Sequence, residues 1–386
     1  MTLQHGREHG DHGNVPSRRP PDDCAKTVAL YFYSLAARGG AERMLTWLAG
    51  TLLDRGYRVV VLSLDAPDDQ AAFALPHEVR WYRLGTKADL SGKARRVAAQ
   101  IRILRRERVD ALIGFVIGAD KTVYAAAIGS GTPLIAAERN DPVIYRDRLS
   151  APKRLVYWAL MRACRRIVIQ LPAYRPGYPL WLQSRIDVIP NPITPAPQGA
   201  ADARPHTGGI VLAVGRLHVQ KGFDLLLAAY ARIAGSFPDW ELRVVGDGPE
   251  RTVLMAQAQK AGIGDRVTFV GERANPGEEM RRADVFAFPS RYEGFPNALA
   301  EAMSHGLPCV GYRACTGAAA LLDHGQNGRL VEPAEDPAAF AAALGELLAD
   351  AQQRAAYGAR ARAAAAHYEA DRIADLWERT IAAATG

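Results

Sequence analysis

Short apolar runs alternate along this chain with segments whose apolar residues recur at helical spacing. In the first half the apolar runs are bounded by Gly, Pro or polar residues, as buried strands of a parallel sheet are. Strands that alternate with helices predict a parallel α/β sheet. The predicted strands are 28–33, 59–64, 111–116, 134–137 and 167–169, and the predicted helices are 41–54, a segment from about 91, a segment after 121 and 150–166.

The same alternation begins again at residue 208. A β-like run over 208–214 precedes an amphipathic helix, and a second run over 285–288 precedes a helix that begins near Asn297. The Ala-rich stretch 338–384 is helical by propensity. Pro and Gly cluster between residues 190 and 205, as is typical of a domain boundary. The sequence therefore predicts two α/β halves.

One turn in the second half carries candidate binding chemistry. The segment E-G-F-P-N-A-L-A-E places Glu293 and Glu301 eight residues apart, on either side of a turn that follows a predicted strand. Ligands bind at the carboxyl ends of parallel strands. The N–H groups of Gly294 and Phe295, the positive end of the next helix and two carboxylates suit sugar hydroxyl groups. A surface loop with two solvated glutamates is the alternative.

A second loop, G-R-L-H-V-Q-K-G at 215–222, carries two cations, Arg216 and Lys221. Fixed positive charge of this kind can stabilise a diphosphate whose bond to a sugar is breaking. An ordinary polar loop is again the alternative. In the turn after another predicted strand, Gly246 and Gly248 permit a ligand to approach the backbone closely.

Together these stretches resemble the donor half of the family 4 glycosyltransferases, retaining enzymes of the GT-B type. G-G-A-E-R-M at 39–44 is also similar to the first acceptor-side loop of that family. The other motifs are V-I-P-N-P-I (188–193), V-G-R-L-H-V-Q-K-G-F-D (214–224), V-V-G-D-G-P-E (244–250), D-R-V-T-F-V-G (265–271) and P-S-R-Y-E-G-F-P-N-A-L-A-E-A-M-S-H-G-L-P-C-V (289–310).

The resemblance implies an α/β fold of two Rossmann-like domains that face each other across an interdomain cleft. The implied division is a disordered tail (1–26), an acceptor domain (27–195), a linker (196–207), a nucleotide-sugar donor domain (208–366) and a carboxyl-terminal helix (367–386). That last helix is expected to pack back on the first domain.

The resemblance also implies roles for single residues. Arg216 and Lys221 would hold the donor diphosphate, Glu301 would accept hydroxyls of the nucleotide ribose, and Glu293 would face the transferred sugar. After Thr316-Gly317, many relatives carry a polar or acidic residue, whereas this chain reads A-A-A-L, so no side-chain contact to the donor is expected there. The implied donor-binding residues are Gly39, Gly40, Gly215, Gly246, Gly271, Glu272, Arg273, Gly294, Phe295, Pro296, Asn297, Ala298, Leu299 and Glu301.

Length and composition fit a globular protein of two domains, with 386 residues of which 48% are apolar. No apolar run approaches the ~18–20 residues of a membrane span, and the first residues are too polar for a signal peptide, so we expect a cytoplasmic chain. The four cysteines lack zinc spacing, and the histidines of the first 13 residues fit a disordered extension better than a metal site. We therefore expect no cofactor and no metal.

Charge is divided unevenly between the halves. Residues 1–200 hold 29 Lys and Arg against 18 Asp and Glu, a net charge of +11, whereas residues 201–386 hold 19 against 23, a net charge of −4. Basic stripes on two helices of the first half suit an anionic membrane or a lipid diphosphate, with solvated helix faces as the alternative. We therefore predict peripheral binding to the cytoplasmic leaflet. The stripes comprise Arg95, Arg102 and Arg106 on one helix and Arg154, Trp158, Arg162 and Arg165 on the next.

Acceptor chemistry is expected in loops of the first half. Asp120 follows the strand 111–116, at a position similar to one where family members place acceptor-side polar residues. It is predicted to contact or deprotonate the acceptor hydroxyl. Capping of the following helix is its alternative role, because Asp is a good N-cap residue. Glu138-Arg139-Asn140-Asp141 follows the next strand.

The family resemblance implies transfer with retention of configuration. Both a front-face reaction, in which the departing phosphate takes the acceptor proton, and a covalent intermediate are open; we favour the first because no carboxylate is clearly placed as nucleophile. The expected donor is UDP-hexose or UDP-N-acetylhexosamine, with GDP-mannose next. The expected acceptor is membrane-associated, such as a polyprenyl-diphosphate-linked saccharide of cell-surface polysaccharide or lipopolysaccharide synthesis.

Two other functions are alternatives. One is a UDP-sugar 2-epimerase on the same architecture. The other is a non-enzymatic basic protein that binds membrane or nucleic acid, suggested by a pI of about 9.3. Nucleic acid is not an expected partner, because no basic stretch interleaved with aromatic residues is found.

Overall fold

The computed structural model describes residues 25–36, 39–85, 90–116, 118, 120–142, 145, 149–193, 196 and 209–386. The predicted tail (1–26) and linker (196–207) lie outside the described residues, except for residues 25, 26 and 196.

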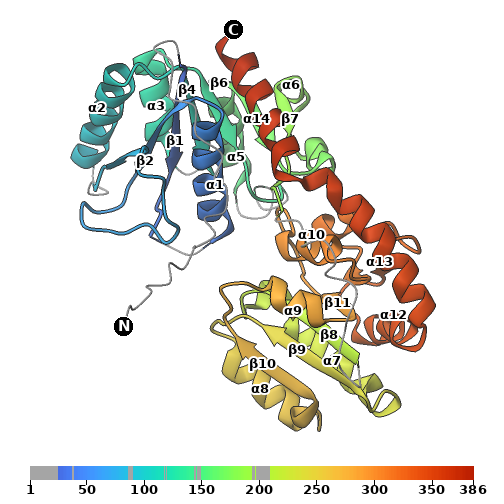
Figure 1. Ribbon diagram of the computed structural model, residues 1–386. Helices are drawn as coiled ribbons and strands as arrows, with labels where there is room; N and C mark the ends of the chain where they lie inside the picture. Colours follow the sequence, from blue (N-terminus) through green and yellow to red (C-terminus); the bar gives the residue numbers. More distant parts are fainter. Residues whose placement is uncertain are drawn as a thin grey trace, which may run out of the picture.

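Seven parallel strands form the sheet of the amino-terminal domain, in the order β3-β2-β1-β4-β5-β6-β7 (Figure 1). The strands are β1 (Thr27–Phe32), β2 (Arg58–Ser63), β3 (Arg80–Arg83), β4 (Ala111–Phe115), β5 (Leu134–Ala137), β6 (Cys164–Ile169) and β7 (Ile186–Val188). The helices are α1 (Gly40–Asp54), α2 (Leu90–Arg106), α3 (Lys121–Ser130), α5 (Ala151–Met161) and α6 (Leu180–Gln183).

Side chains alternate across this sheet, and each face packs against different helices. Val28 and Leu30 of β1 belong to a core cluster with apolar residues of α1, whereas Ala29 and Tyr31 belong to one with residues of α2, α3 and α5. Both faces of the sheet are therefore covered, which explains why its strands read as near-continuous apolar runs.

Six parallel strands form the second sheet, in the order β10-β9-β8-β11-β12-β13. The strands are β8 (Gly209–Val214), β9 (Trp240–Val245), β10 (Val267–Gly271), β11 (Val285–Phe288), β12 (Cys309–Tyr312) and β13 (Gly328–Val331). The helices are α7 (Phe223–Ile233), α8 (Arg251–Lys260), α9 (Gly277–Arg282), α10 (Asn297–Ser304), α11 (Thr316–Leu321), α12 (Pro337–Ala349) and α13 (Ala351–Ala365). Two parallel α/β domains confirm the predicted fold class.

The last helix, α14 (Ala370–Thr385), returns to the amino-terminal domain, as the red segment of Figure 1 shows. Its Trp377 is fully buried, and its ring stacks on that of Phe115 from β4, with centroids 6.2 Å apart. Ile373 and Ile381 belong to the same core cluster as residues of α1 and β1. The amino-terminal core is thus completed by the carboxyl-terminal end of the described chain.

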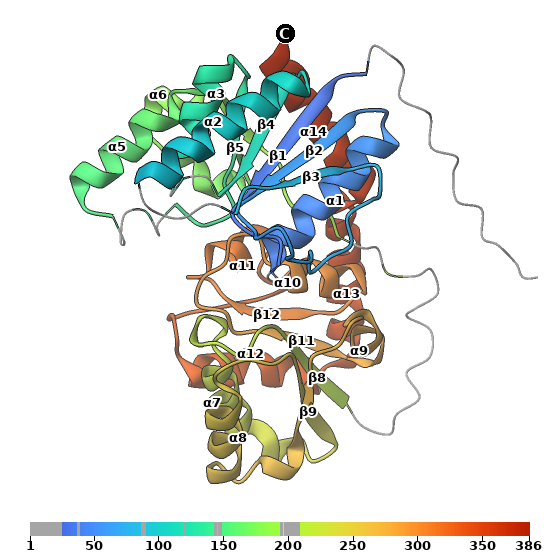
Figure 2. The ribbon, with the colours of Figure 1, turned by 90° about the vertical axis from the view of Figure 1, so that its left-hand side faces the viewer.

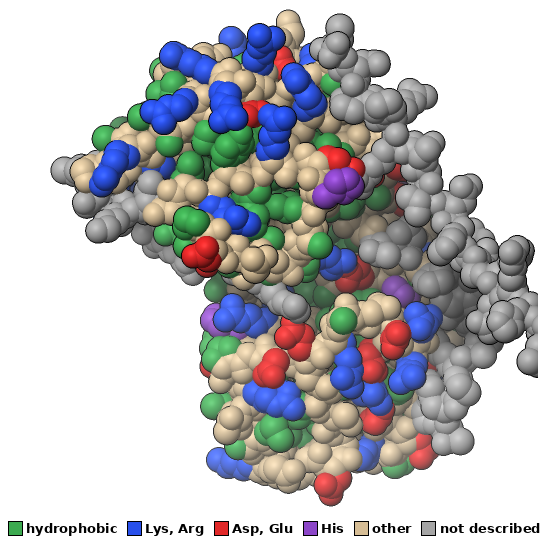
Figure 3. Space-filling model, turned by 60° about the vertical axis from the view of Figure 1, so that its left-hand side comes forward, with side chains coloured by type: hydrophobic (Ala, Val, Ile, Leu, Met, Phe, Trp, Pro, Cys, Tyr) green, Lys and Arg blue, Asp and Glu red, His purple; other side chains and the backbone are tan. Residues whose placement is uncertain are grey.

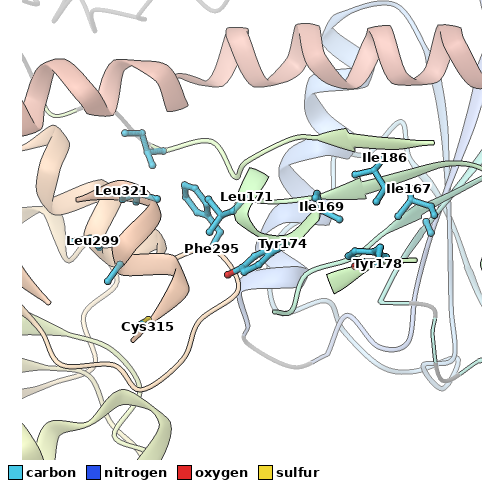
Figure 4. Packing of buried hydrophobic residues seen from close by; sticks show 14 of the residues in the cluster. Ile167, Ile169, Leu171, Tyr174, Tyr178, Ile186, Phe295, Leu299, Cys315 and Leu321 are labelled. Atoms are coloured by element: carbon cyan, nitrogen blue, oxygen red, sulfur yellow. The ribbon is translucent and has the colours of Figure 1, made fainter. Parts of the chain in front are cut away.

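The two domains meet where α10 and α11 lie below the first sheet (Figure 2). Figure 4 shows Phe295, from the turn before α10, beside Leu171 and Tyr174, which follow β6. These buried side chains belong to one hydrophobic cluster that extends from β6 and β7 to α10 and α11. The turn that holds Phe295 is therefore packed against both domains.

One predicted helix ends early. Residues 150–166 were expected to form a single helix, but α5 ends at Met161 and β6 begins at Cys164. Cys164 and Arg166 pair with β5, so sheet pairing overrides the helical spacing of these residues.

Candidate active site

The carboxyl ends of both sheets face one interdomain pocket of about 730 Å³. Its amino-terminal wall follows strands β1, β4, β5, β6 and β7, and its other wall follows β8 and β11, as expected for ligand sites of parallel sheets. The amino-terminal wall comprises Phe32, Tyr33, Gly40, Ala41, Arg43, Val116, Arg139, Asn140, Gln170 and Asn191. The other wall comprises Val214, Gly215, Gln220, Lys221, Pro276, Phe288, Glu293, Gly294, Phe295, Pro296, Asn297, Ala298 and Glu301.

Lys221 and Glu293, which the sequence suggested separately, form an ion pair at this pocket. The Lys221 ammonium donates to Glu293 Oε1 at 2.5 Å, and the Ser290 hydroxyl donates to the same oxygen at 2.9 Å. Both side chains are largely buried. Lys221 is brought there by the short turn after β8, in which Gly222 adopts φ +68° against the carbonyl of Pro289. The pocket thus holds a fixed cation beside a fixed carboxylate.

Glu301 lies one turn into α10 and faces the amino-terminal domain. Arg43 of α1 donates to its Oε1 at 3.3 Å, so this ion pair bridges the domains. Burial raises the pKa of the Glu301 carboxyl above its usual range, and the nearby Arg43 partly offsets that rise. Arg43 and Glu301 also border a smaller hollow of about 240 Å³ beside Trp47.

Arg216 does not line the same pocket as Lys221. It is exposed and lines an adjoining hollow of about 350 Å³, which shares Val214, Gly215 and Pro276 with the larger pocket. Gly246, Glu272 and Arg273 line this adjoining hollow. Lys221 and Arg216 therefore line two different hollows that meet at the end of β8, and they do not lie side by side.

Buried polar groups form the floor between the walls. Arg139 is almost fully buried, and burial lowers the pKa of its guanidinium to about 9, with the neighbouring Glu138 acting in the opposite direction. The guanidinium lies over the rings of Phe115 and Trp377, at 4.8 and 5.5 Å from their centroids. Tyr174, in the turn after β6 of the same domain, donates to the carbonyl oxygens of Glu293 and Gly294 at 2.7 and 2.5 Å.

Three of the expected donor-binding residues do not line either hollow. Gly39 caps α1 without lining the pocket, and Gly271 pairs with Gly246 in an isolated β-bridge behind it. Leu299 is fully buried in the hydrophobic core, so its expected place at the donor is wrong. Each helical residue turns by 100°, and Leu299 therefore faces away from the wall formed by Asn297, Ala298 and Glu301.

Asp120 is the N-cap of α3 and is absent from the pocket wall. Its Oδ1 accepts from the Thr122 N–H and hydroxyl at 2.9 and 2.7 Å. Its Oδ2 accepts from the Tyr31 hydroxyl and, at 3.3 Å, from Arg96. A carboxylate offers about four lone-pair positions, all of which are taken. The capping alternative therefore describes this residue, and it has no position left for an acceptor hydroxyl.

The predicted basic stripes are exposed only in part. Arg95, Arg102 and Arg106 are exposed on α2, and Arg162 is exposed just after α5. Figure 3 shows Lys and Arg side chains spread over this face of the amino-terminal domain. Trp158, however, is only 7% exposed, and its ring contacts those of Tyr145, Tyr157 and Tyr178. Its assignment to a surface stripe is wrong, because the apolar ring belongs to the face of α5 that packs on the domain.

Two further members of the second stripe differ from the expectation. Arg154 is on α5 but only half-exposed. Arg165 is exposed, yet it lies in strand β6 and not on a helix. The helical spacing of Arg165 with Arg162 is therefore coincidental.

Several site residues were not singled out from the sequence as donor or catalytic residues. They are Arg43, Arg139, Asn140, Tyr174, Gln170 and Asn191. All except Arg43 follow strands β5, β6 or β7, and the position of a polar residue after a buried strand is the signal that could have found them. Among the described residues, no group of three or more His, Cys, Asp or Glu side chains is arranged to hold a metal ion. Nor does the described part of the chain contain a helix long and apolar enough to cross a bilayer.

Two family models match the chain one after the other. The model described as Glycosyltransferase Family 4 matches residues 38–196, and that described as Glycosyl transferases group 1 matches residues 199–364. An uncharacterized glycosyltransferase of Haemophilus influenzae is 27% identical over 314 residues, which are 80% of this chain and 86% of that protein.

Other relatives match over a shorter region. An exopolysaccharide phosphotransferase of Streptomyces coelicolor is 34% identical over 50% of this chain and 20% of its own length. A lipopolysaccharide 1,6-galactosyltransferase of Salmonella typhimurium is 31% identical over 38% of this chain and 42% of its own length. The matched part of the chain thus spans less than half of each of these two relatives.

Solved structures share the fold. The apo form of the lipopolysaccharide outer core galactosyltransferase WaaB superposes with a TM-score of 0.74 at 18% identity, covering 92% of this chain and 99% of that one. HepE of Anabaena, in complex with UDP-glucose, has a TM-score of 0.75 at 22% identity, with 92% and 99% covered.

Proposed function

The chain belongs to the glycosyltransferases of GT-B fold, with a family 4 domain followed by a group 1 domain, and on this premise we propose that it transfers a hexose or N-acetylhexosamine from a UDP-sugar to a saccharide acceptor. The observation that carries the proposal is the single pocket that Lys221, Glu293 and Glu301 of one domain share with Arg43, Arg139 and Asn191 of the other. A donor and an acceptor held by different domains would meet there.

The proposed chemistry is electrostatic and needs no metal or cofactor. Lys221 would stabilise the charge that develops on the departing diphosphate, with Arg216 contributing from the adjoining hollow. Glu293 would then exchange its ion pair with Lys221 for hydroxyls of the transferred sugar. Glu293 Oε1 is held by Lys221 and Ser290, Glu301 is assigned to the ribose, and no other carboxylate lines the described pocket. A front-face reaction with retention is therefore favoured, in which the leaving phosphate takes the acceptor proton.

A role in cell-surface glycan synthesis is supported by the relatives. Two glycosyltransferases named for amylovoran biosynthesis and lipopolysaccharide core biosynthesis, and a protein named as an exopolysaccharide phosphotransferase, match this chain at 32 to 34% identity over part of their length. A GDP-mannose-dependent mannosyltransferase of Mycolicibacterium smegmatis matches at 34% identity over 42% of its length, which keeps GDP-mannose as the second candidate donor.

A thermal-shift panel of nucleotides and nucleotide sugars tests the donor proposal. A ligand at ~100 times its dissociation constant stabilises a protein by about 2.7 kcal/mol, so UDP and UDP-sugars should raise Tm clearly and GDP should not. Incubation with a UDP-sugar and an acceptor fraction should then give a glycosylated product, whereas an epimerase would return only an isomeric nucleotide sugar. A Tm shift with GDP alone would contradict the proposed donor.

Glu301→Gln should abolish the shift caused by UDP without destabilising the free protein. Because the folded-state pKa of Glu301 is raised, its ionised form costs stability that is regained only as pH falls through that pKa. The variant removes this cost, so its Tm at pH 7 without nucleotide should equal or exceed that of the parent. In the parent, affinity for UDP should weaken as pH falls through the same pKa, because protonation removes the charged acceptor of the ribose hydroxyls. An undiminished UDP shift in the variant would contradict the role of Glu301.

We further propose that the amino-terminal domain binds the cytoplasmic leaflet, through α5 and α6 rather than through an arginine stripe alone. Leu155 on α5 is 67% exposed, Leu180 on α6 is 84% exposed, and Trp181 is half-exposed beneath the guanidinium of Arg162. Figure 2 shows both helices on the same side of this domain. Exposed apolar side chains with a cation beside them suit an anionic lipid surface.

Co-sedimentation with vesicles tests this surface. The protein should pellet with phosphatidylglycerol vesicles and much less with neutral phosphatidylcholine vesicles, and Leu155→Glu with Leu180→Glu should lower the pelleted fraction severalfold. Val253→Glu is the matched control, because Val253 is similarly exposed but lies on α8 of the other domain. Equal loss in both variants, or equal binding to both kinds of vesicle, would refute the proposed surface.

A further inference from the structure

A network of side-chain hydrogen bonds, which we call the amide relay, crosses the domain boundary at the floor of the pocket. It links Arg139 and Gln170 to Asn191, and Asn191 to Asn297. Asn191 Oδ1 accepts from Arg139 Nη1 at 3.1 Å and from Gln170 Nε2 at 2.8 Å. Asn191 Nδ2 then donates to Asn297 Oδ1 at 2.9 Å, across the boundary. Asn191, Arg139 and Gln170 are all at least nine-tenths buried, and Asn297 is the first residue of α10.

The hydrogen-bonding groups of the amide relay fix which way round the Asn191 and Asn297 amides lie. A guanidinium has donors and no acceptor, so the Asn191 atom that faces Arg139 must be its oxygen. The Asn191 amide nitrogen must therefore face Asn297, and the Asn297 atom that meets it must again be an oxygen. The Asn297 nitrogen is left on the opposite side, beside Gly40 of α1, where a Cβ on that glycine would lie 3.5 Å away. Both Gly40 and Asn297 line the pocket.

We propose that Asn191 is a positioning residue that fixes the amide of Asn297 with its nitrogen toward the pocket, where it donates a hydrogen bond to an oxygen of the bound nucleotide sugar. The accepting oxygen belongs to the diphosphate of the nucleotide sugar or to the sugar that it carries, both of which are rich in hydrogen-bond acceptors. This inference rests on the proposed function for the identity of the ligand, but the amide orientation itself does not.

The relay also makes the donor contact depend on the domain arrangement. Arg139, Gln170 and Asn191 belong to the amino-terminal domain, whereas Asn297 begins a helix of the other. If the domains part, Asn297 loses the partner that orients it, and its amide can turn either atom to the pocket. Substrate is therefore held with a correctly oriented Asn297 only while the two domains touch at this point.

Asn191→Asp tests the relay with almost no change of shape. The introduced carboxylate still accepts from Arg139 and Gln170, but it has no hydrogen to give to Asn297. Asn297 is then expected to turn its nitrogen to this carboxylate and present its oxygen to the pocket. The donor contact would become a repulsion, and kcat/KM for the nucleotide sugar should fall about 10- to 100-fold, mainly through a higher KM for the donor.

A double-variant comparison separates positioning from a structural role. In an Asn297→Ala background the relay has nothing to orient, so Asn191→Asp should change kcat/KM by less than about twofold there. The same loss in both backgrounds would overturn the proposal.

Asn297→Asp, on the pocket wall, is a second variant. It still accepts the hydrogen bond from Asn191, but it lacks the amide nitrogen that would donate to the nucleotide sugar, so it should lose activity to a similar degree. Full activity would overturn the proposal.

A readout without substrate distinguishes this inference from the proposed function. The side-chain amide signal of Asn297 in the ¹⁵N-labelled protein is assigned by its absence from Asn297→Ala. This signal should move in Asn191→Asp, because the amide then donates to a carboxylate, and an unmoved signal would overturn the relay. If the parent protein neither binds nor turns over any nucleotide sugar while the signal moves as expected, the proposed function fails and the amide orientation stands.

Discussion

Lys221→Met should lower kcat/KM for the nucleotide sugar by about 10²- to 10³-fold, the loss seen when one fixed group that stabilises transition-state charge is removed. Lys221 is the one cation of the described pocket that lies on the carboxyl-terminal domain, since Arg43 and Arg139 come from the other domain and Arg216 lines the adjoining hollow. Met keeps most of the length of the side chain without its charge. Steady-state kinetics with a saturating acceptor would measure the loss.

The stability of this variant needs a control, because Lys221→Met leaves the Glu293 carboxylate buried without its ion-pair partner. Such a loss typically costs about 3–5 kcal/mol in a fully buried pair, and less here because the lysine is partly exposed. Adding Glu293→Gln should restore most of the Tm, since the neutral amide can still accept from Ser290. Activity should stay low in the double variant. Activity close to that of the parent in Lys221→Met would contradict the proposed role.

Gly294→Ala should reduce both activity and the contact between the domains. A Cβ on Gly294 would overlap the Arg139 carbonyl oxygen and lie 2.8 Å from the Gln170 amide oxygen, so the turn must move away from the amino-terminal domain. A shift of about 1 Å in a reacting group can cost on the order of 10²-fold in rate. We expect a loss of that size, and a larger radius of gyration by solution X-ray scattering.

Gly235→Ala is the matched control for this substitution. Gly235 lies in a short 3₁₀ turn of the same domain, and a Cβ there would meet no atom within 4 Å. Its activity and scattering profile should equal those of the parent. If Gly294→Ala also had the activity and scattering profile of the parent, the turn could move without effect. The packing of its Phe295 against Leu171 and Tyr174 would then not position the sugar.

The pattern of the sequence predicted the sheets better than it predicted the helix ends. The strand at 134–137 coincides with β5, and that at 285–288 coincides with β11, because both are buried on two faces and read as uninterrupted apolar runs. The strand β3, R-W-Y-R, was not predicted, since it lies at the sheet edge and carries polar residues. Residues 164–166 continue the helical spacing of the segment before them, but they pair with β5 and form the start of strand β6.

The wall of the pocket on the carboxyl-terminal domain was accessible to sequence reasoning because Lys221 and Glu293 lie in two short loops of one domain. Lys221 and Glu293 are 72 positions apart, yet each follows a strand, and adjacent parallel strands bring their ends together. The opposite wall depends on how the domains meet, and no local pattern reports that. Arg43 is a surface residue of an ordinary amphipathic helix until α10 of the other domain brings Glu301 beside it.

The return of α14 also bears on how the protein is made. Trp377 and Ile381 complete the core beneath α1 and β1, although they lie at the opposite end of the chain from both elements. During synthesis, the first sheet therefore leaves the ribosome long before the helix that covers one of its faces. Until residues 370–385 emerge, the part of that face which α14 covers is open to water, although α1 already packs on the same face. The nascent amino-terminal domain therefore exposes apolar surface, which favours aggregation until synthesis is complete.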